Sequence, residues 1–425
     1  MYVRRVPTVV SFQQLESEST VAQPTIGNTP VGECLNKHLL KVSFAFQKDL
    51  HCSRVRSFGE LRDLEDWEKG REAARAESVT SNDSEDLPSH LSFDPDQRSP
   101  LDTTLLALWD MCNDEGLFRY DVTACTTKAI PGAYGFIAQL NEGRATKKRP
   151  TEFRVDKVVQ PFDDGKFNFN KAYMKEVLFQ FNADAVGETT IDEEGLVTKD
   201  PHLVMINVSP IEYGHVLLVP SVLKRLPQLI TPDTMLLALQ FAAAVDNPYF
   251  RVGYNSLGAY ATINHLHFQG YYLMAPYPVE RAPTESTDCS KWNCAGVRVS
   301  RLAEYPVRGL VFEKTGSLEQ MSDVLGRACV RLQQENIPHN LLISDCGARV
   351  FLWPQCYAEK QARGLVPEEI LATGVNPAAF EIAGHMVLKA RQDYEDITQR
   401  QAWKMLAEVS LDEDRFDDAI RICLE

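Results

Sequence analysis

The stretch LVMINVSPIEYGHVLLVP, Leu203 to Pro220, decides how we interpret the fold of this chain. Two short apolar runs, Leu203 to Val208 and His215 to Val219, flank the segment Ser209 to Gly214, which contains turn-forming residues. Short apolar runs separated in this way are typical of a β-hairpin with a longer loop. The segment therefore predicts two neighbouring antiparallel strands.

The same pattern returns later in the chain, with helices between the hairpins. Leu341 to Ser344 and Arg349 to Leu352 flank the turn Asp345 to Gly347 and predict a second hairpin. Before it, Ser317 and Gln320 form a capping box at the start of an amphipathic helix. Strands followed by helices, twice, favour an α+β fold on an antiparallel sheet over a βαβ parallel sheet.

Other elements are predicted from shorter signals. The remaining helices are expected at Thr103 to Cys112, at Leu229 to Ala244 and over most of the tail after Pro377. The remaining strands are expected where β-branched and aromatic residues gather: Gly135 to Leu140, Phe153 to Val159, Ala259 to Leu273, Val297 to Leu302 and Gly309 to Phe312.

Length and charge divide the chain into three parts. Its 425 residues allow two or three domains. Acidic residues outnumber basic ones 12 to 5 between residues 60 and 98, and Ser78 to Pro100 is rich in Ser, Asp and Pro. We therefore expect residues 1–100 to be a mobile, partly disordered region. Two α+β halves would follow, 101–280 with the motif described below and 281–425 with a helical C-terminus.

Composition excludes several classes of function. Lys and Arg number 44 against 59 Asp and Glu, and this net charge of -15 disfavours binding to nucleic acid or anionic membranes. The 10 cysteines form no CxxC pair, so we expect no metal and no cofactor. The longest apolar stretch, Met235 to Val245, is shorter than the roughly 20 residues of a membrane span.

The segment INHLHFQ, Ile263 to Gln269, carries the sharpest chemical signal. In a strand His265, His267 and Gln269 would share one face, where three polar groups suit a ligand better than a core. Two structural histidines or a metal-binding pair are the alternatives, although no nearby carboxylate or Cys completes a metal site. Small and polar residues upstream suit a phosphate beside a nitrogen nucleophile: Asn255, Ser256, Gly258 and Thr262.

These residues carry a resemblance to a known family. HLHFQ resembles the H-x-H-x-Q variant of the histidine triad motif, found in the galactose-1-phosphate uridylyltransferase branch of nucleotidyltransferases. Longer blocks resemble the GDP-L-galactose phosphorylases, plant enzymes of the ascorbate pathway, over roughly residues 101–410. Besides the first hairpin, these blocks are QLNEGR (Gln139 to Arg144), KKRPTEFRVDKV (Lys147 to Val158), NPYFRVGYNSLGAYATINHLHFQGYYL (Asn247 to Leu273), ISDCG (Ile343 to Gly347), PQCYAEKQA (Pro354 to Ala362) and GHMVLK (Gly384 to Lys389).

The resemblance implies a reaction and roles for the motif. GDP-hexose and phosphate would give hexose 1-phosphate and GDP, with His267 as the nucleophile that holds GMP covalently. His265 would orient it through its backbone and ring, and Gln269 would donate hydrogen bonds to phosphate oxygens. Thr262 falls where related proteins carry a phosphate-contacting hydroxyl. Ala261, in contrast, stands where many small histidine triad hydrolases carry Gln, and its methyl group cannot make the corresponding phosphate contact. Because an amide cannot give up a proton, Gln269 suits transfer to phosphate better than hydrolysis.

Charge on the transferred group also needs neutralisation. Arg144, Lys147 and Lys148 belong to the densest basic cluster of the chain, which is either a solvated loop, a nuclear import signal or a phosphate-capturing segment. His385, in an expected helical stretch, is interpreted as structural. Cys346 lacks a nearby His in the sequence and is not expected to act as a nucleophile.

Three functions remain open at this point. The first is the phosphorylase acting on GDP-L-galactose, and the second is a sister enzyme acting on GDP-D-glucose. The third is a regulator that binds nucleotide without turnover, which the presence of both His residues and Gln269 disfavours. The expected partners are GDP-hexose and inorganic phosphate, with no nucleic acid and no membrane. We further expect a homodimer, located in the cytoplasm with the nucleus as a second location.

Overall fold

The computed structural model describes residues 29–31, 98–147, 152–181, 201–287 and 293–425. Most of the expected N-terminal region therefore lies outside the described residues. The body is built on one ten-stranded sheet in which every neighbouring pair is antiparallel. In spatial order its strands are β3 (Val177–Phe181), β4 (His202–Ile206), β5 (Val216–Val219), β7 (Phe268–Tyr272), β6 (Phe250–Asn255), β11 (His339–Ser344), β12 (Arg349–Pro354), β10 (Leu310–Lys314), β9 (Val297–Leu302) and β8 (Thr284–Ser286).

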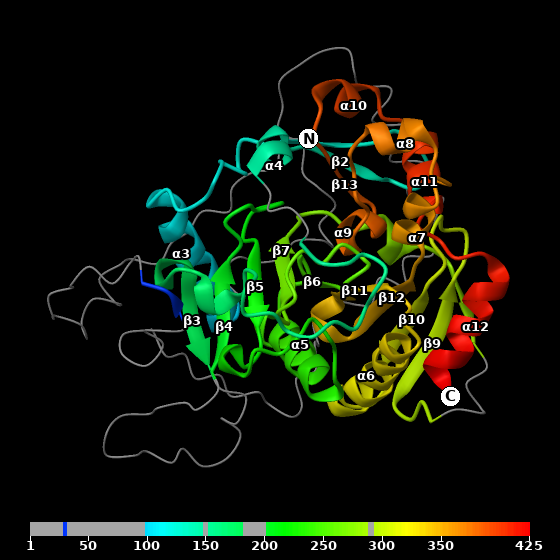
Figure 1. Ribbon diagram of the computed structural model, residues 1–425, viewed down its shortest axis with the longest axis horizontal. Coiled ribbons are helices and arrows are strands. Elements are labelled where there is room, and N and C mark those ends of the chain that lie inside the picture. The colour runs from blue at the N-terminus through cyan, green and yellow to red at the C-terminus, as the bar shows by residue number, and fades with distance from the viewer. Residues whose placement is uncertain (1–28, 32–97, 148–151, 182–200, 288–292) are drawn as a thin grey trace, which may run out of the picture.

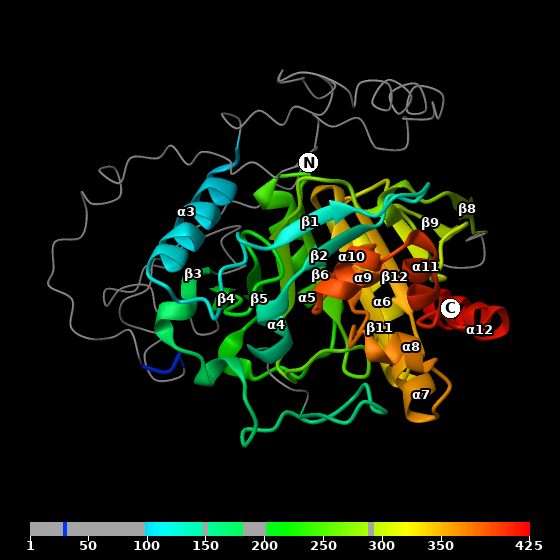
Figure 2. The same ribbon diagram turned by 90° about the horizontal axis from the view of Figure 1, so that it is seen from above.

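Four long helices pack against one face of this sheet. They are α3 (Pro100–Asp114), α5 (Pro232–Val245), α6 (Leu318–Gln334) and α12 (Glu413–Leu424). Figure 1 shows α5 and α6 side by side below the strands, and Figure 2 shows α3 and α12 at opposite ends of the molecule. Their apolar residues form one core with the strand residues that face them, Val350 and Leu352 among them.

A small sheet covers the opposite face. It consists of β1 (Thr126–Ala129), β2 (Ile137–Leu140) and β13 (His385–Leu388), and β13 pairs with β2 in parallel. Phe351 and Trp353 of β12 belong to this second core, because side chains alternate between the two faces of a strand. The short helices are α4 (Glu142–Lys147), α7 (Tyr357–Ala362), α8 (Glu368–Ala372), α9 (Ala379–Ile382), α10 (Arg391–Asp396) and α11 (Gln399–Ala407), and the 3₁₀ turns are η5 (Phe169–Lys171), η6 (Met174–Glu176), η7 (Val222–Lys224), η8 (Pro278–Arg281) and η9 (Asp345–Gly347).

The predicted architecture is confirmed in its main features. The fold is α+β on antiparallel sheet, both hairpins form, and the capping box of Ser317 and Gln320 opens α6. The prediction for the tail was wrong in part, because His385 lies in β13, a strand, rather than in a helix. In a segment of four residues, the pattern of apolar residues does not distinguish a fully buried strand from a buried helix.

One predicted strand was also wrong, and a second is shorter than expected. Residues 153–159 form no strand, because side chains bind their backbone instead, as when Asn336 Oδ1 accepts the N–H of Val158 at 2.9 Å. The strand expected over residues 259–273 begins only at Phe268. Gly258 and Tyr260 have positive φ angles of 78° and 70°, which an extended strand does not allow. His265 and His267 therefore lie in the loop that leads into β7.

Candidate active site

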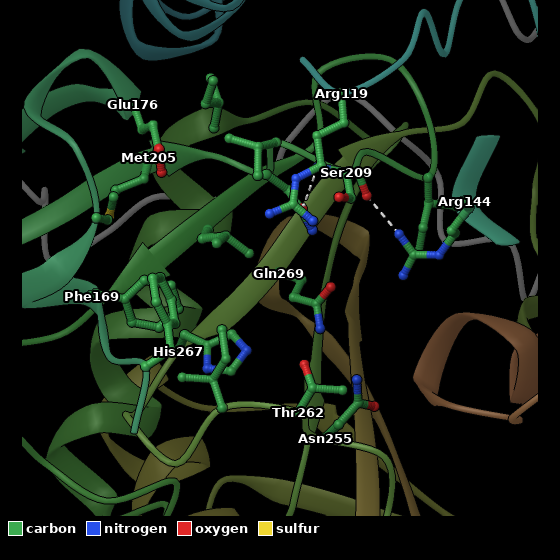
Figure 3. Close-up of a pocket in the computed structure, with 18 of the residues that line it drawn as sticks. Arg119, Arg144, Phe169, Glu176, Met205, Ser209, Asn255, Thr262, His267 and Gln269 are labelled. Atoms are coloured by element: carbon green, nitrogen blue, oxygen red, sulfur yellow. Dashed lines mark hydrogen bonds between the residues drawn. The ribbon is translucent and has the colours of Figure 1, made fainter. Parts of the chain in front are cut away.

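A pocket opens where the loop before β7 meets the ends of β4, β5 and β6. Its apolar wall comes from η5 and the strands, and the opposite wall includes residues of α9 in the second half of the chain. His267, Gln269, Asn255, Thr262 and Arg144 all line it, so five of the predicted site residues are brought together (Figure 3).

His267 is held in one orientation and one tautomer. Its Nδ1 lies 2.8 Å from the carbonyl oxygen of His265, which can only accept, so Nδ1 carries the proton and Nε2 the lone pair. Burial lowers the pKa of His267 to about 4, so the imidazole is neutral at pH 7. Gln228 fixes its backbone by accepting from the N–H at 2.9 Å and donating to the carbonyl at 3.1 Å. The result is a preoriented nitrogen nucleophile.

His265 does not line the pocket. It is buried between the rings of Phe162 and Phe169, and its Nδ1 accepts the N–H of Phe169 at 3.1 Å. Burial, together with neighbouring His267, lowers its pKa to about 3. The ring of His265 thus anchors η5, while its carbonyl group orients His267.

Gln269 is held by a residue that the sequence analysis did not single out. The backbone N–H of Ile211 donates to Nδ1 of His215 at 2.8 Å, so the proton of this fully buried imidazole sits on Nε2. That nitrogen lies 3.3 Å from Oε1 of Gln269. The amide oxygen is therefore turned toward His215, and the amide NH₂ is left for the pocket.

Asn255 presents its amide in the same way. Its Oδ1 accepts from Asn340 Nδ2 at 2.6 Å and from the N–H of Ala379 at 3.0 Å, so its NH₂ is the end that is left for a ligand. Figure 3 shows the amide nitrogens of Asn255 and Gln269 and the hydroxyl of Thr262 pointing toward one another beside His267. Three donors next to a nucleophile form a place for anionic oxygen.

Positive charge enters the pocket from two arginines. Arg144, at the middle of α4, donates from Nη1 to the carbonyl of Ser209 at 2.5 Å. Arg119, which the sequence analysis missed, lies on the same side of the pocket (Figure 3). Lys147 ends α4, and Lys148 lies outside the described residues, so a role for either in phosphate binding stays a prediction.

Two predicted phosphate-binding residues lie outside this pocket. Ser256 is buried, and its Oγ accepts the N–H of His339 at 2.9 Å. Gly258 makes the turn described above, and a Cβ there would lie 2.9 Å from the carbonyl oxygen of Val155. Both residues shape the loop ahead of Thr262 rather than contact a ligand in the pocket.

Some of the residues missed by the sequence analysis carry a local sequence signal for their role, and others carry none. His215 stands in the quoted hairpin, where a His followed by an apolar run is visible. Arg119, Gln228 and Asn340 carry no local signal, because long-range contacts alone bring Arg119 to the pocket and place Gln228 and Asn340 behind His267 and Asn255. Within the described ranges, no group of three or more His, Cys, Asp or Glu side chains could hold a metal ion, and no helix is long and apolar enough to cross a membrane.

Known proteins are similar in sequence to this chain over most of its length. Arabidopsis thaliana GDP-L-galactose phosphorylase 1 is 56% identical over 331 residues, which cover 76% of this chain and 73% of that protein. Homo sapiens GDP-D-glucose phosphorylase 1 is 35% identical over 337 residues, covering 76% and 82%. Yeast Ap4A phosphorylase Apa2 in complex with Ap4A aligns with a TM-score of 0.49 at 12% identity, over 74% of this chain and 98% of that chain.

Family models match both halves of the chain. The model described as the GDPGP1-like N-terminal domain matches residues 100–271, and the GDPGP1-like C-terminal domain matches residues 278–425. Together they include nearly all of the described residues and every pocket residue named above. The chain therefore belongs to the GDPGP1-like family.

Proposed function

We propose that this protein is a GDP-hexose phosphorylase that transfers GMP through His267 to inorganic phosphate. The observation that carries the proposal is the neutral imidazole of His267, with its lone pair on Nε2, beside the donors of Gln269, Asn255 and Thr262. A nucleophile next to preorganised donors is what nucleotidyl transfer requires.

The reaction would proceed in two displacements. Nε2 of His267 attacks the α-phosphorus of GDP-hexose, a P–N bond forms, and the P–O bond to hexose 1-phosphate breaks. A phosphate oxygen then attacks the same phosphorus, the P–N bond breaks, and GDP leaves. Positive charge on the ring is stabilised by the carbonyl of His265, and the arginines Arg119 and Arg144 offset the negative charge of the phosphates.

L-Galactose is our first choice of hexose. The relatives named for GDP-L-galactose are 56% and 55% identical to this chain, and the human protein named for GDP-D-glucose is 35% identical. GDP-D-glucose is kept as the second substrate, because the same transfer would serve both sugars. The homodimer expected at the start stays a prediction.

The experiment combines a product assay with an adduct search. Purified protein is incubated with GDP-L-galactose, GDP-D-glucose or GDP-mannose, with and without phosphate, and GDP and hexose 1-phosphate are measured. Without phosphate, peptide mass spectrometry should find GMP on His267. The proposal fails if no GDP-hexose yields GDP, or if the adduct maps to another residue.

A further inference from the structure

Three buried amide side chains connect the second half of the chain to the pocket. Asn255 ends β6, Asn340 is its cross-strand partner on β11, and Gln355 follows β12. Their exposed fractions are 5%, 0% and 1%. Burying three amides is costly unless each is hydrogen-bonded, so their arrangement needs an explanation.

The three amides form a chain of hydrogen bonds. Gln355 Nε2 donates to Asn340 Oδ1 at 2.8 Å, and Asn340 Nδ2 donates to Asn255 Oδ1 at 2.6 Å. At the far end, the backbone N–H of Tyr357 donates to Gln355 Oε1 at 3.1 Å. Every bond therefore runs in one direction, from β12 through β11 to the pocket.

The direction of this chain is fixed by the backbone. A backbone N–H can only donate, so the N–H of Tyr357 decides which end of the Gln355 amide is the oxygen. Two further backbone groups require the same orientation: Ala259 O accepts from Asn340 Nδ2 at 3.0 Å, and the N–H of Ala379 donates to Asn255 Oδ1 at 3.0 Å. No amide in the chain can turn over without breaking these contacts.

We infer that Asn340 and Gln355 are positioning residues of this site: their hydrogen bonds hold the Asn255 amide so that its NH₂ faces the transferred nucleotidyl group. The inference rests on the proposed function for the identity of the reaction. A donor that is already oriented when charge develops stabilises the transition state without reorganisation. Hydrogen-bonded amides also polarise one another, which strengthens the last donor of the chain.

Asn340→Asp is the sharpest test, since it changes the chemistry of the chain and almost none of its volume. A carboxylate cannot donate to Asn255 Oδ1 and would instead accept from the Asn255 NH₂, which draws this NH₂ away from the pocket at the cost of the contact with the N–H of Ala379. We expect kcat/KM for phosphorolysis to fall about 10²-fold, as for removal of one oxyanion donor. Asn340→Ala, which removes the donor without adding charge, should give a smaller loss.

A double-mutant cycle separates positioning from general damage. If Asn340 acts through Asn255, then adding Asn340→Ala to the Asn255→Ala variant should change kcat/KM by less than about threefold. If the fold-losses of kcat/KM in the two single variants multiply in the double variant, the inference is overturned. Asn247→Ala is the matched control: it removes another buried amide, which pairs with Asp102 outside the pocket, and it should lower the melting temperature while leaving kcat/KM unchanged.

Binding of GDP, measured by calorimetry, keeps the two proposals apart. Wild-type protein that binds GDP but phosphorolyses no GDP-hexose contradicts the proposed function. In that case the GDP affinities of the variants alone test the hydrogen-bonded amides. Asn340→Asp should bind GDP at least tenfold more weakly than wild type. Equal affinities in a folded variant would overturn the inference.

Discussion

Strand β6 carries Arg251 and Asn255 on one face, and each of them belongs to a buried polar cluster. Around Arg251 every group finds a partner within the protein: Nε and Nη2 donate to Glu280 at 3.0 and 2.9 Å, and Nη1 donates to the carbonyl of Leu273 at 2.8 Å. Around Asn255 the side-chain oxygens of Asn255 and Gln269 are engaged within the protein, while the NH₂ groups of these two residues and the lone pair of His267 are left facing the pocket.

Gly253 lies between these clusters on the same face. A Cβ there would lie 3.0 Å from the ring of Phe380 and 3.3 Å from Ala379, so the glycine lets α9 approach the strand. This approach brings the N–H of Ala379 to Asn255. A closed polar cluster fixes the packing of the sheet, whereas an open one prepares a binding site. Mutations should therefore affect stability at one end of β6 and turnover at the other.

The largest expected effect is on turnover, at the open cluster. His267→Ala removes the nucleophile, and GMP transfer should fall by at least about 10⁴-fold, as when other covalent catalysts lose theirs. The ring lines the pocket but is buried against Phe169, so we expect a loss of stability as well, smaller than at the closed cluster. Steady-state phosphorolysis and urea denaturation measure both quantities. If His267→Ala turns over within tenfold of wild type, His267 is not the nucleophile.

The next effect is on stability, at the closed cluster. Burial alone would raise the pKa of Glu280, but Arg251 and Ser344 outweigh it and hold the pKa below its usual range, so the pair is ionised. Glu280→Leu leaves Arg251 charged and unpaired, which should cost about 3–5 kcal/mol of unfolding free energy. The double variant Arg251→Met/Glu280→Leu should recover part of this loss. Equal losses of unfolding free energy in the single and double variants would show that the unpaired charge of Arg251 is not the cause of the loss.

A smaller effect is expected at His215, which holds Gln269 from behind. His215→Phe keeps an aromatic ring but leaves the Gln269 amide free to turn, and kcat should fall about 10- to 100-fold with KM nearly constant. In a Gln269→Ala background the same change should have almost no further effect on kcat. An undiminished loss in that background would show that His215 acts by another route.

The last expected effect concerns pH and is shared among several buried groups. Burial lowers the pKa of His265, His267, His339 and His385 to between about 3 and about 4, from an ordinary value of 6.5. The unfolded chain therefore binds more protons below pH 6.5, and stability should fall as the pH drops from about 6.5 toward about 4. Burial also lowers the pKa of His215, which adds to this effect. Burial raises the pKa of Glu212 to about 7 and raises the pKa values of Asp102 and Asp345, and these three carboxyl groups act in the opposite direction to the five histidines. Urea denaturation at pH 7 and pH 5 tests this, and equal free energies would contradict it.

Local signals predicted local structure well. The capping box of Ser317 and Gln320 and the turn residues between β11 and β12 act within a few residues, so α6 and the second hairpin were predicted from sequence. The position of the motif histidines was not, because positive φ angles at Gly258 and Tyr260 override the strand propensity of the residues that follow. His267 and Gln269 share the pocket nonetheless, while His265 does not.

The environment of the pocket was the hardest part to predict. Asn340 and Gln355 have no unusual neighbours in the sequence, and they gain a role only through the register of β6, β11 and β12. Arg119 likewise reaches the pocket from the segment after α3. Contacts between residues so distant in sequence depend on the whole fold, which a single sequence does not reveal.

The parallel pairing of β2 with β13 also sets the order in which the molecule can be completed during synthesis. Ile137 lies opposite His385, so this ladder closes a loop of about 250 residues, and contacts of such separation form slowly. The segment with His267 leaves the ribosome well before Asn340, Ala379 and β13 are made. A nascent chain that ends after β7 therefore carries His267 without the groups that orient its neighbours. Under the proposed function, we expect nucleotidyl transfer only once the second half has folded onto the first.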